Sequence, residues 1–177
     1  LTLFLDLLHH GIKREVIIKF DKNINDEADK INVKSNETWK RFYENDYSYI
    51  VENFYSQLLS ITSCTHCDYY ASNHDPIQVI SLEIKPNTKS IYDCLNQYTK
   101  KFQIDKKNQW KCDQCNNYVC PFKQTKLWNT SDILILLIKR YKGNQKINTF
   151  IEYPFDLNME DYNINFSSDK NNNYSLQ

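Results

Sequence analysis

Apolar residues at helical spacing predict a helix at the start of the chain, over residues 1–11. They are Leu1, Phe4, Leu5 and Leu8, and residues at these intervals share one face of a helix. Gly11 follows them and is placed to cap the helix, because glycine adopts the left-handed conformation that ends many helices. We therefore expect a short amphipathic helix that ends at Gly11.

A polar stretch over residues 21–35 has few apolar anchors and predicts a surface loop. Asn36 follows it and is expected to be the N-cap of a second helix. The polar pair Asn45 and Asp46 is a point at which this helix can divide in two. Its apolar stripe consists of Trp39, Phe42, Tyr43, Ile50 and Phe54.

From residue 55 the pattern changes to the alternation that is typical of half-buried strands. Leu59 and Ile61 alternate with polar neighbours up to Cys64. Residues 77–84 (IQVISLEI) predict another strand, bounded by Asp75-Pro76 on one side and Pro86-Asn87 on the other. After Ser90, an expected N-cap, comes the clearest amphipathic helix of the chain. Its apolar residues are Ile91, Leu95, Tyr98 and Phe102, at steps of four, three and four.

The last third of the chain is expected to be mainly strand. Residues 118–127 can return as the partner of a strand that includes Lys111. Residues 133–138 (ILILLI) are apolar on both faces, as a strand in the middle of a covered sheet requires. Residues 147–153 predict a short strand stopped by Pro154, and the Asn-rich stretch 163–173 predicts a surface loop. The chain is therefore expected to contain strands and a few helices.

Two C-x-x-C pairs are the strongest chemical signal in the sequence: Cys64 with Cys67, and Cys112 with Cys115. A C-x-x-C turn directs two thiolates at one ion, and two such turns complete a closed four-thiolate zinc site. The residues after the second cysteines, Asp68 and Asn116, tolerate the positive φ that such turns often need. Two disulfides, four reduced core thiols, or a site that keeps its ligands without metal are the alternatives.

The other two cysteines and the histidines give a weaker signal. Cys94 and Cys120 can act as nucleophiles only with a histidine in reach, and such lone cysteines are usually small buried apolar groups. His66 lies inside a C-x-x-C turn and is expected to face solvent rather than bind metal. The remaining histidines are His9, His10 and His74.

Charge and hydropathy exclude some classes of function. The 22 basic and 22 acidic residues give a formal net charge of zero, so the chain lacks the basic field that non-specific nucleic-acid binding needs. A zinc-ribbon nucleic-acid module remains an alternative, because lysines cluster around the second cysteine pair (Lys106, Lys107, Lys111, Lys123, Lys126). The longest apolar run, 133–138, is too short to cross a bilayer. The start of the chain has no secretory-signal pattern, so we expect an intracellular protein, or one whose true start has been cut away.

A set of short motifs in a fixed order resembles the catalytic domain of the ubiquitin-specific proteases. Each motif is short, but together they cover nearly the whole chain in the order of the family. They are Phe4–His9, Ile50–Leu58 (family I-V-x-x-x-F-x-G-Q-L), Cys64–Cys67, Asp75–Ile77, Leu82–Ile84, Cys94–Tyr98 (C-L-x-x-Y), Trp110–Cys115, Lys123 (A-x-K), Leu137–Tyr141 (L-K-R-F), Lys146–Asn148 (K-x-N) and Tyr153–Leu157 (F-P-x-x-L-D-L).

The resemblance implies an α+β fold: the central part of one hand-like, cysteine-protease fold over residues 1–177, with antiparallel β fingers, a palm sheet and a few helices. Residues 1–54 would supply thumb and palm helices, 55–127 the zinc-stapled fingers with an inserted helix, 128–162 palm strands, and 163–177 a loop and the start of the next strand. In the family, fingers and palm hold ubiquitin, and zinc lies near the fingertips. The resemblance therefore implies ubiquitin or ubiquitinated proteins as partners, with neither nucleic acid nor membrane, in the cytoplasm or nucleus.

The same resemblance implies that this chain carries no catalytic residue. It begins after the family's Gln-Asp-x-x-Glu-Phe motif and stops at Tyr174-Ser175-Leu176, which resembles the start of the strand before the catalytic histidine. We expect the chain alone to be inert, because thiolate activation needs both partners in one site. The complete parent would be a thiol-type deubiquitinase that cleaves after the C-terminal glycine of ubiquitin, or an inactive ubiquitin-binding scaffold.

Some residues depart from the family pattern. Ser56 replaces the glycine before Gln57, Thr130-Ser131 replaces a Leu-Pro pair, and Phe102 stands where a glutamate is common. These departures are expected in a divergent member of the family.

Overall fold

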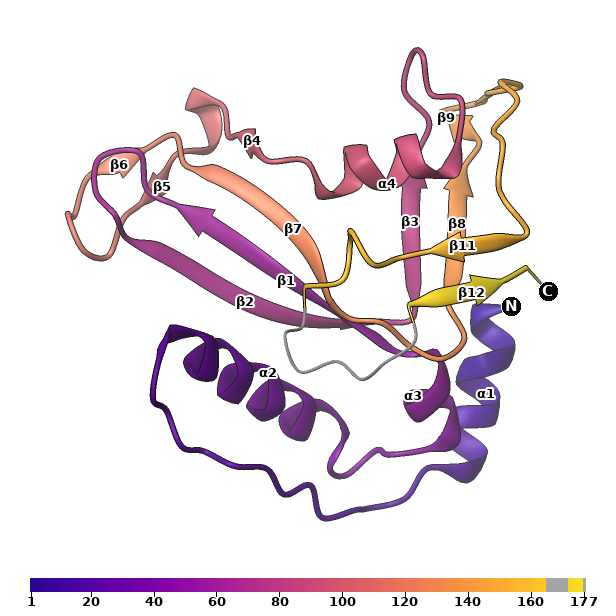
Figure 1. The fold of residues 1–177 in the computed structure, drawn as a ribbon, viewed down its shortest axis with the longest axis horizontal. Helices are drawn as coiled ribbons and strands as arrows, with labels where there is room; N and C mark the ends of the chain where they lie inside the picture. Colours follow the sequence, from indigo (N-terminus) through magenta and orange to yellow (C-terminus); the bar gives the residue numbers. More distant parts are fainter. Residues whose placement is uncertain (165–171, 177) are drawn as a thin grey trace.

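The structure, a computed structural model, describes residues 1–164 and 172–176 and has an α+β architecture (Figure 1). The helices are α1 (Thr2–Ile12), α2 (Glu27–Tyr43), α3 (Tyr49–Phe54), α4 (Ile91–Thr99) and the 3-10 turn η1 (Lys106–Asn108). The strands are β1 (Ser56–Ser63), β2 (Tyr70–Ile77), β3 (Val79–Glu83), β4 (Phe102–Gln103), β5 (Trp110–Lys111), β6 (Tyr118–Val119), β7 (Phe122–Asn129), β8 (Ile135–Lys139), β9 (Tyr141–Lys142), β10 (Gln145–Lys146), β11 (Asp156–Asn158) and β12 (Asn173–Ser175).

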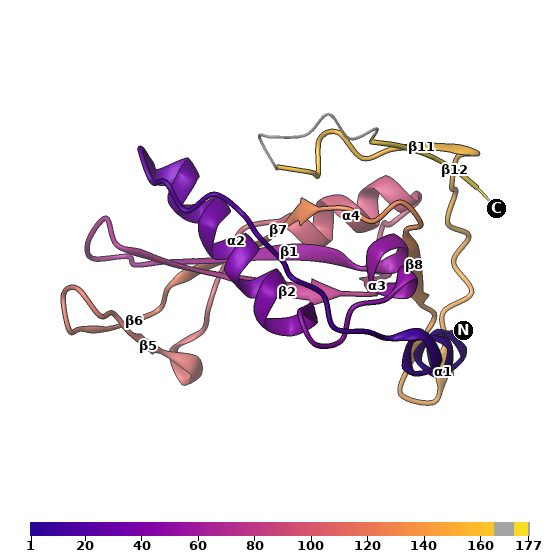
Figure 2. The ribbon, with the colours of Figure 1, turned by 90° about the horizontal axis from the view of Figure 1, so that it is seen from below.

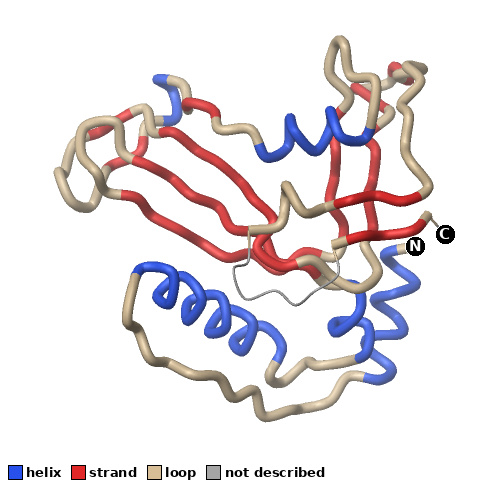
Figure 3. The backbone as a smooth tube through the Cα atoms, viewed as in Figure 1, coloured by secondary structure: helices blue, strands red, loops and turns tan. Residues whose placement is uncertain are grey.

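A four-stranded antiparallel sheet, the finger sheet, forms the long axis of the molecule. Its strand order is β2-β1-β7-β4, and β1 pairs along its whole length with β2. The loops that hold the cysteine pairs lie at one end of this sheet, and the parallel pair β3–β8 lies at the other, together with both chain termini (Figures 1 and 2). Figure 3 shows helix α2 along one side of the sheet and α4 on the opposite side.

The first helix is confirmed, but Gly11 does not end it. Helix α1 continues through Ile12, and Lys13 at its C-cap is extended. The helix ends there because the next residue, Arg14, enters a bridge with Tyr47, to whose carbonyl its N–H donates at 2.8 Å.

The predicted loop over residues 21–35 is wrong from residue 27 onward, where α2 begins. Its N-cap is Asp26, whose side chain accepts a hydrogen bond from the Asp29 N–H, and not Asn36. The buried residues of α2 include Ser35 and Thr38, so its core-facing side lacks a clear apolar stripe in the sequence. The expected break near residues 45–46 is confirmed: α2 ends at Tyr43 and α3 begins at Tyr49.

Strand β2 contains a proline that the sequence interpretation took as a boundary. Asp75 and Pro76 lie inside β2, and Pro76 is paired with Gln57. Proline is tolerated there because β2 is an edge strand and needs hydrogen-bond donors on one side only. The strand predicted over 77–84 is the shorter β3, and the strand predicted before Cys64 is confirmed as β1.

Helix α4 packs the main core between the finger sheet and β3. Ser90 and Asp93 form the full capping box, which confirms the predicted start of the helix. The helix ends at Thr99, so Phe102 is not part of its stripe but lies in β4, 54% exposed. Leu82, Leu95 and Leu127 are fully buried in this core.

The strands predicted for the last third are confirmed in part. Residues 118–127 divide at Cys120-Pro121 into β6 and β7. Among the described residues β8 pairs only with β3, and Leu137 is 51% exposed, so β8 is not covered on both faces as expected. Residues 147–153 form no strand; instead the Glu152 N–H donates to the Lys89 carbonyl beside the start of α4. Most of the loop predicted over 163–173 lies outside the described residues.

Two departures from the family pattern are partners of each other. Ser56, at the start of β1, and Ser131, just after β7, are both buried. The Ser131 N–H donates to Ser56 Oγ at 3.0 Å, and the two hydroxyl oxygens lie 3.1 Å apart. A proline at position 131 would have no N–H, and a glycine at position 56 would have no acceptor. The second serine therefore satisfies the buried polar group that the first introduces.

We predict that this pair is energetically coupled. Ser131→Pro leaves the buried Ser56 hydroxyl without its donor and should lower the free energy of unfolding by about 1–2 kcal/mol. In the double variant Ser56→Gly, Ser131→Pro part of this loss should be recovered. Denaturant unfolding of the two single variants and the double variant measures the coupling. Ser131→Ala, which keeps the N–H, is the control. If the effects of Ser56→Gly and Ser131→Pro on the free energy of unfolding simply add in the double variant, the coupling is contradicted.

Candidate metal centre

Two hairpin loops bring the paired cysteines together at the tip of the finger sheet. The first loop joins β1 to β2 and holds Cys64 and Cys67; the second joins β5 to β6 and holds Cys112 and Cys115. Figure 1 shows the two loops at the same end of the molecule. Residues 68–111 separate the pairs in the sequence, so the finger sheet and η1 must fold to make them neighbours.

The four sulfur atoms have the spacing of a tetrahedral thiolate site. Cys64 Sγ lies 3.8 Å from Cys115 Sγ, and Cys67 Sγ lies 3.7 Å from Cys112 Sγ. All four sulfurs lie within 4.8 Å of one another. A zinc–sulfur bond of about 2.3 Å in a tetrahedral site places sulfurs about 3.8 Å apart, whereas a disulfide needs about 2 Å. The cysteines are free thiols, and the cluster can hold one metal ion.

Backbone hydrogen bonds shape each loop. The Cys64 N–H donates to the Tyr69 carbonyl at 2.9 Å, and the Cys112 N–H donates to the Asn117 carbonyl at 3.0 Å. Asn116 has a φ of 56°, as its position after Cys115 predicts, but Asp68 is not among the residues with positive φ, so that part of the prediction is wrong. The two backbone hydrogen bonds, from Cys64 and from Cys112, close the two turns.

The electrostatics of the cluster favour a cation among the sulfurs. Burial would raise the pKa of Cys64, but hydrogen bonds to its sulfur, one of them from the His66 N–H at 3.3 Å, lower it to about 7. The Tyr69 N–H would lower the pKa of Cys67, but burial and the neighbouring sulfurs raise it to about 12. Adjacent thiolates repel one another, so all four ionise together only around a positive ion. The ring of His66 is exposed, as expected.

The other cysteines and histidines do not form a catalytic pair in the described part of the chain. Cys94 is 1% exposed within α4, and burial raises the pKa of its thiol. His9 Nδ1 lies 2.8 Å from Ser48 Oγ, and His10 Nδ1 lies 2.8 Å from the Asp6 carbonyl oxygen. No hydrogen bond within residues 1–164 and 172–176 joins a thiol to an imidazole ring. The sequence interpretation did not single out His74, which is fully buried in β2.

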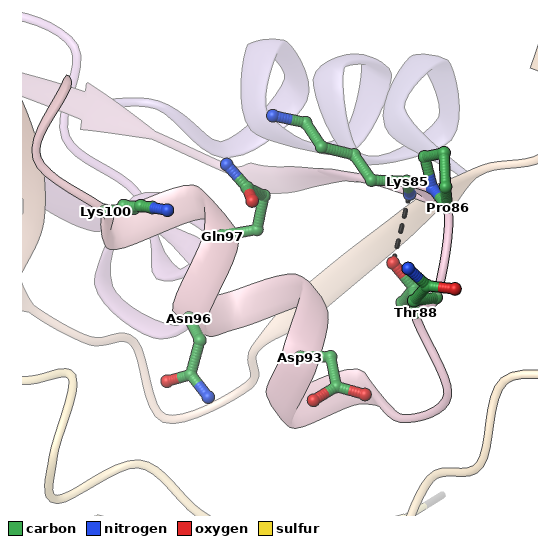
Figure 4. A pocket seen from close by; sticks show the side chains of 8 residues that line it. Lys85, Pro86, Thr88, Asp93, Asn96, Gln97 and Lys100 are labelled. Carbon is green, nitrogen blue, oxygen red and sulfur yellow. Dashed lines mark hydrogen bonds between the residues drawn. The ribbon is translucent and has the colours of Figure 1, made fainter. Parts of the chain in front are cut away.

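A shallow polar pocket of about 300 Å³ lies between α4 and the loop that precedes it (Figure 4). The Asp93 carboxylate already accepts the Lys89 and Ser90 N–H groups, and Thr88 Oγ1 accepts the Lys85 N–H. Neither cysteine nor histidine lines it, so it offers no thiol nucleophile and no imidazole base. Its lining residues are Lys85, Pro86, Asn87, Thr88, Asp93, Asn96, Gln97 and Lys100. The cysteine cluster is therefore the chemically distinctive site of the described chain.

Comparison with known proteins identifies the family. The family model described as "Ubiquitin carboxyl-terminal hydrolase" matches residues 1–177. The chain belongs to this family. A probable ubiquitin carboxyl-terminal hydrolase of Acanthamoeba polyphaga mimivirus is 31% identical over 159 residues, which are 84% of this chain and 34% of that protein. Ubiquitin carboxyl-terminal hydrolase 5 of Saccharomyces cerevisiae is 28% identical over 166 residues, 89% of this chain and 21% of that protein.

Solved structures of the same family have the same fold. A SAGA Ubp8/Sgf11/Sus1/Sgf73 DUB module bound to ubiquitin aldehyde matches with a TM-score of 0.61 and 29% identity, over 81% of this chain and 33% of that one. A Ubp8(S144N) module matches with a TM-score of 0.67 and 26% identity, over 99% of this chain and 38% of that one. The predicted family and hand-like α+β fold are confirmed. The chain spans about a third or less of the curated relatives it matches.

The structure also bears on the membrane prediction. Within residues 1–164 and 172–176, every helix is too short or too polar to span a bilayer.

Proposed function

We propose that this chain is the finger and palm part of a deubiquitinating thiol protease. In this proposal the chain binds ubiquitin, and the complete parent hydrolyses the bond after the C-terminal glycine of ubiquitin. The observation that carries the proposal is the family match over residues 1–177, on a fold shared with modules solved with ubiquitin aldehyde and with monoubiquitin. The divisions at residues 54, 127 and 162 remain our assignment of thumb and palm helices, fingers, and palm strands.

We further propose that Cys64, Cys67, Cys112 and Cys115 bind one structural Zn²⁺. The sulfur spacing and the chemistry of four thiolates support zinc. When bound, the ion would supply a cross-link between the β1–β2 loop and the β5–β6 hairpin. The chain itself forms both loops and the sheet that carries them.

The chain's own residues would bind and position rather than cleave. No described thiol is hydrogen-bonded to an imidazole, so we assign the nucleophile and its base to parts of the parent outside this chain. The rigid elements available for binding are the finger sheet and the helices packed on it. An intracellular location, in cytoplasm or nucleus, follows from this proposed role.

An inactive ubiquitin-binding scaffold is the second candidate. The departures Ser56, Thr130 and Ser131 from the family pattern favour it. Ser56 begins β1, Thr130 and Ser131 directly follow β7, and Ser56 and Ser131 are hydrogen-bonded to each other. The two candidates make opposite predictions for catalysis.

The deciding experiment is hydrolysis of a ubiquitin–dye conjugate by the intact parent. We expect turnover that disappears when the parent's nucleophilic cysteine is changed to alanine, with ubiquitin binding retained. A Cys94→Ala variant, which removes the buried thiol without adding a polar group, is the matched control and should keep full turnover. Ubiquitin binding without hydrolysis would replace the enzyme by the scaffold, and the absence of both would overturn the proposed function.

A further inference from the structure

An aromatic pair crosses between the two cysteine loops. We propose that Tyr69 is a positioning residue for the metal centre: its ring stacks on Trp110 and holds the two loops together so that four thiols reach one ion. This inference rests on the proposed zinc site. Tyr69 lies two residues after Cys67, and Trp110 lies two residues before Cys112.

The geometry of the pair is that of an offset stack. The ring centroids lie 6.1 Å apart, and the ring planes are inclined by 8°. Aromatic pairs in this range attract each other beyond the area they bury. The Tyr69 hydroxyl also donates to Asp113 Oδ2 at 3.4 Å, and Asp113 lies between the cysteines of the second pair. The tyrosine therefore contacts the second loop on both sides of Cys112.

Both rings are attached to rigid backbone. The Tyr69 carbonyl accepts the Cys64 N–H and so closes the first loop. Trp110 pairs with Val119 in the β5–β6 hairpin, which carries the second loop. Because each ring is fixed to its own loop, contact between the rings sets the distance between the loops.

Near the cysteines few interactions join the two loops, although β7, which follows the second loop, pairs with β1 up to Ser63. The β5–β6 hairpin is a separate two-stranded sheet that is not hydrogen-bonded to the finger sheet. Among the described residues no backbone hydrogen bond joins residues 64–69 to residues 110–119. In the described part of the chain, the polar and ring contacts across this gap include the thiol pairs, the stacked rings and the Tyr69–Asp113 hydrogen bond. Without the stack, metal binding would have to order the two hairpins against each other.

The neighbouring tyrosine supplies a matched control. Tyr70 directly follows Tyr69, but its hydroxyl donates to Glu27 at the start of α2, at 3.0 Å. Its side chain therefore contacts a helix on the side of the finger sheet, not the second cysteine loop. A change at Tyr70 removes an aromatic residue from the same stretch of chain without removing the contact between the loops.

The test measures Zn²⁺ affinity of the intact parent by competition with a chromophoric chelator. We expect Tyr69→Leu to weaken zinc binding about fivefold, Tyr69→Phe to stay within about twofold because the stack remains, and Tyr70→Leu to match the wild type. Trp110→Leu should weaken binding as Tyr69→Leu does, and the double variant should be no weaker than the worse single variant.

The outcomes separate this inference from the zinc proposal. A wild type that binds zinc while Tyr69→Leu binds it equally tightly would overturn the positioning role alone. A wild type that binds no stoichiometric zinc would overturn the metal site and, with it, this inference. If a leucine variant unfolds at a lower temperature than the wild type, the rate at which maleimide labels the thiols of the metal-free chain is the second measurement. Tyr69→Phe keeps the stacked ring, so its Cys112 should react with maleimide no faster than Cys112 of Tyr70→Phe. Faster labelling in Tyr69→Phe would contradict the proposal that the stack holds the loops together.

Discussion

Replacing one cluster cysteine, as in Cys115→Ser, is expected to abolish stoichiometric zinc binding and to unfold the tip of the finger sheet. The reason is that structural zinc sites contribute folding free energy directly, and a hairpin such as β5–β6, whose strands have two residues each, cannot bury a core of its own. Metal analysis of the purified protein and limited proteolysis measure the effect. Cleavage should appear near residues 60–70 and 110–120, and Cys64→Ser should behave alike.

Cys120→Ser is the matched control for this prediction. Cys120 lies just beyond β6 and outside the cluster of four sulfurs. Its substitution should leave zinc content and protease resistance unchanged, whereas treatment of the wild type with a strong chelator should reproduce the Cys115→Ser pattern. Unchanged melting and proteolysis of Cys115→Ser would show that the cluster does not stabilise the fingers.

The wild-type protein should also lose stability between about pH 6.5 and pH 4 because of His74. This ring is 1% exposed, and its two nitrogens have no hydrogen-bond partner within the described residues. Burial, with a smaller effect of the nearby Lys34 ammonium, lowers the pKa of His74 from 6.5 to about 4. The ring packs edge-on against Trp128, with centroids 5.2 Å apart.

The sign follows from proton binding. Between pH 4 and pH 6.5 the unfolded chain binds a proton at His74 that the folded chain does not, so the folded state is favoured fully above about pH 6.5 and progressively less below it. At pH 4 the free energy of unfolding should therefore be lower by roughly 3 kcal/mol than above pH 6.5. Denaturant unfolding from pH 4 to pH 7 should show a shallower pH dependence for His74→Leu than for the wild type.

His10→Leu is the control, because His10 is an exposed histidine at the end of α1. The free energy of unfolding of His10→Leu should change with pH as that of the wild type does. Because acid also protonates thiolates, the informative quantity is the difference between wild type and His74→Leu, measured in excess chelator. Parallel pH curves for these two proteins would contradict the account of His74.

Sequence patterns predicted the elements whose signals are local. The cap at Ser90, the strand before Cys64 and each single C-x-x-C turn depend on residues a few positions apart. Helix α2 was misplaced because its buried side contains Ser35 and Thr38, which do not mark an apolar face. Sequence patterns therefore predict an element where the residues that determine it lie close together in the sequence. They fail where packing against distant parts of the chain determines which residues are buried.

Features that depend on distant partners were missed. Strand β2 was hidden by Asp75-Pro76, which is acceptable only because the strand lies at the sheet edge. The apolar stretch 147–153 looked like a strand, but its backbone bonds instead to the start of α4 through Lys89. The stack of Tyr69 on Trp110 had no signal in the sequence, since neither ring's direction could be known before the two loops were placed.

The most direct test of the account is X-ray absorption at the zinc edge of the purified intact protein. We expect one zinc per chain, surrounded by four sulfurs at about 2.3 Å. Zinc absent after purification under reducing conditions, or coordinated by nitrogen and oxygen in place of these thiolates, would contradict it.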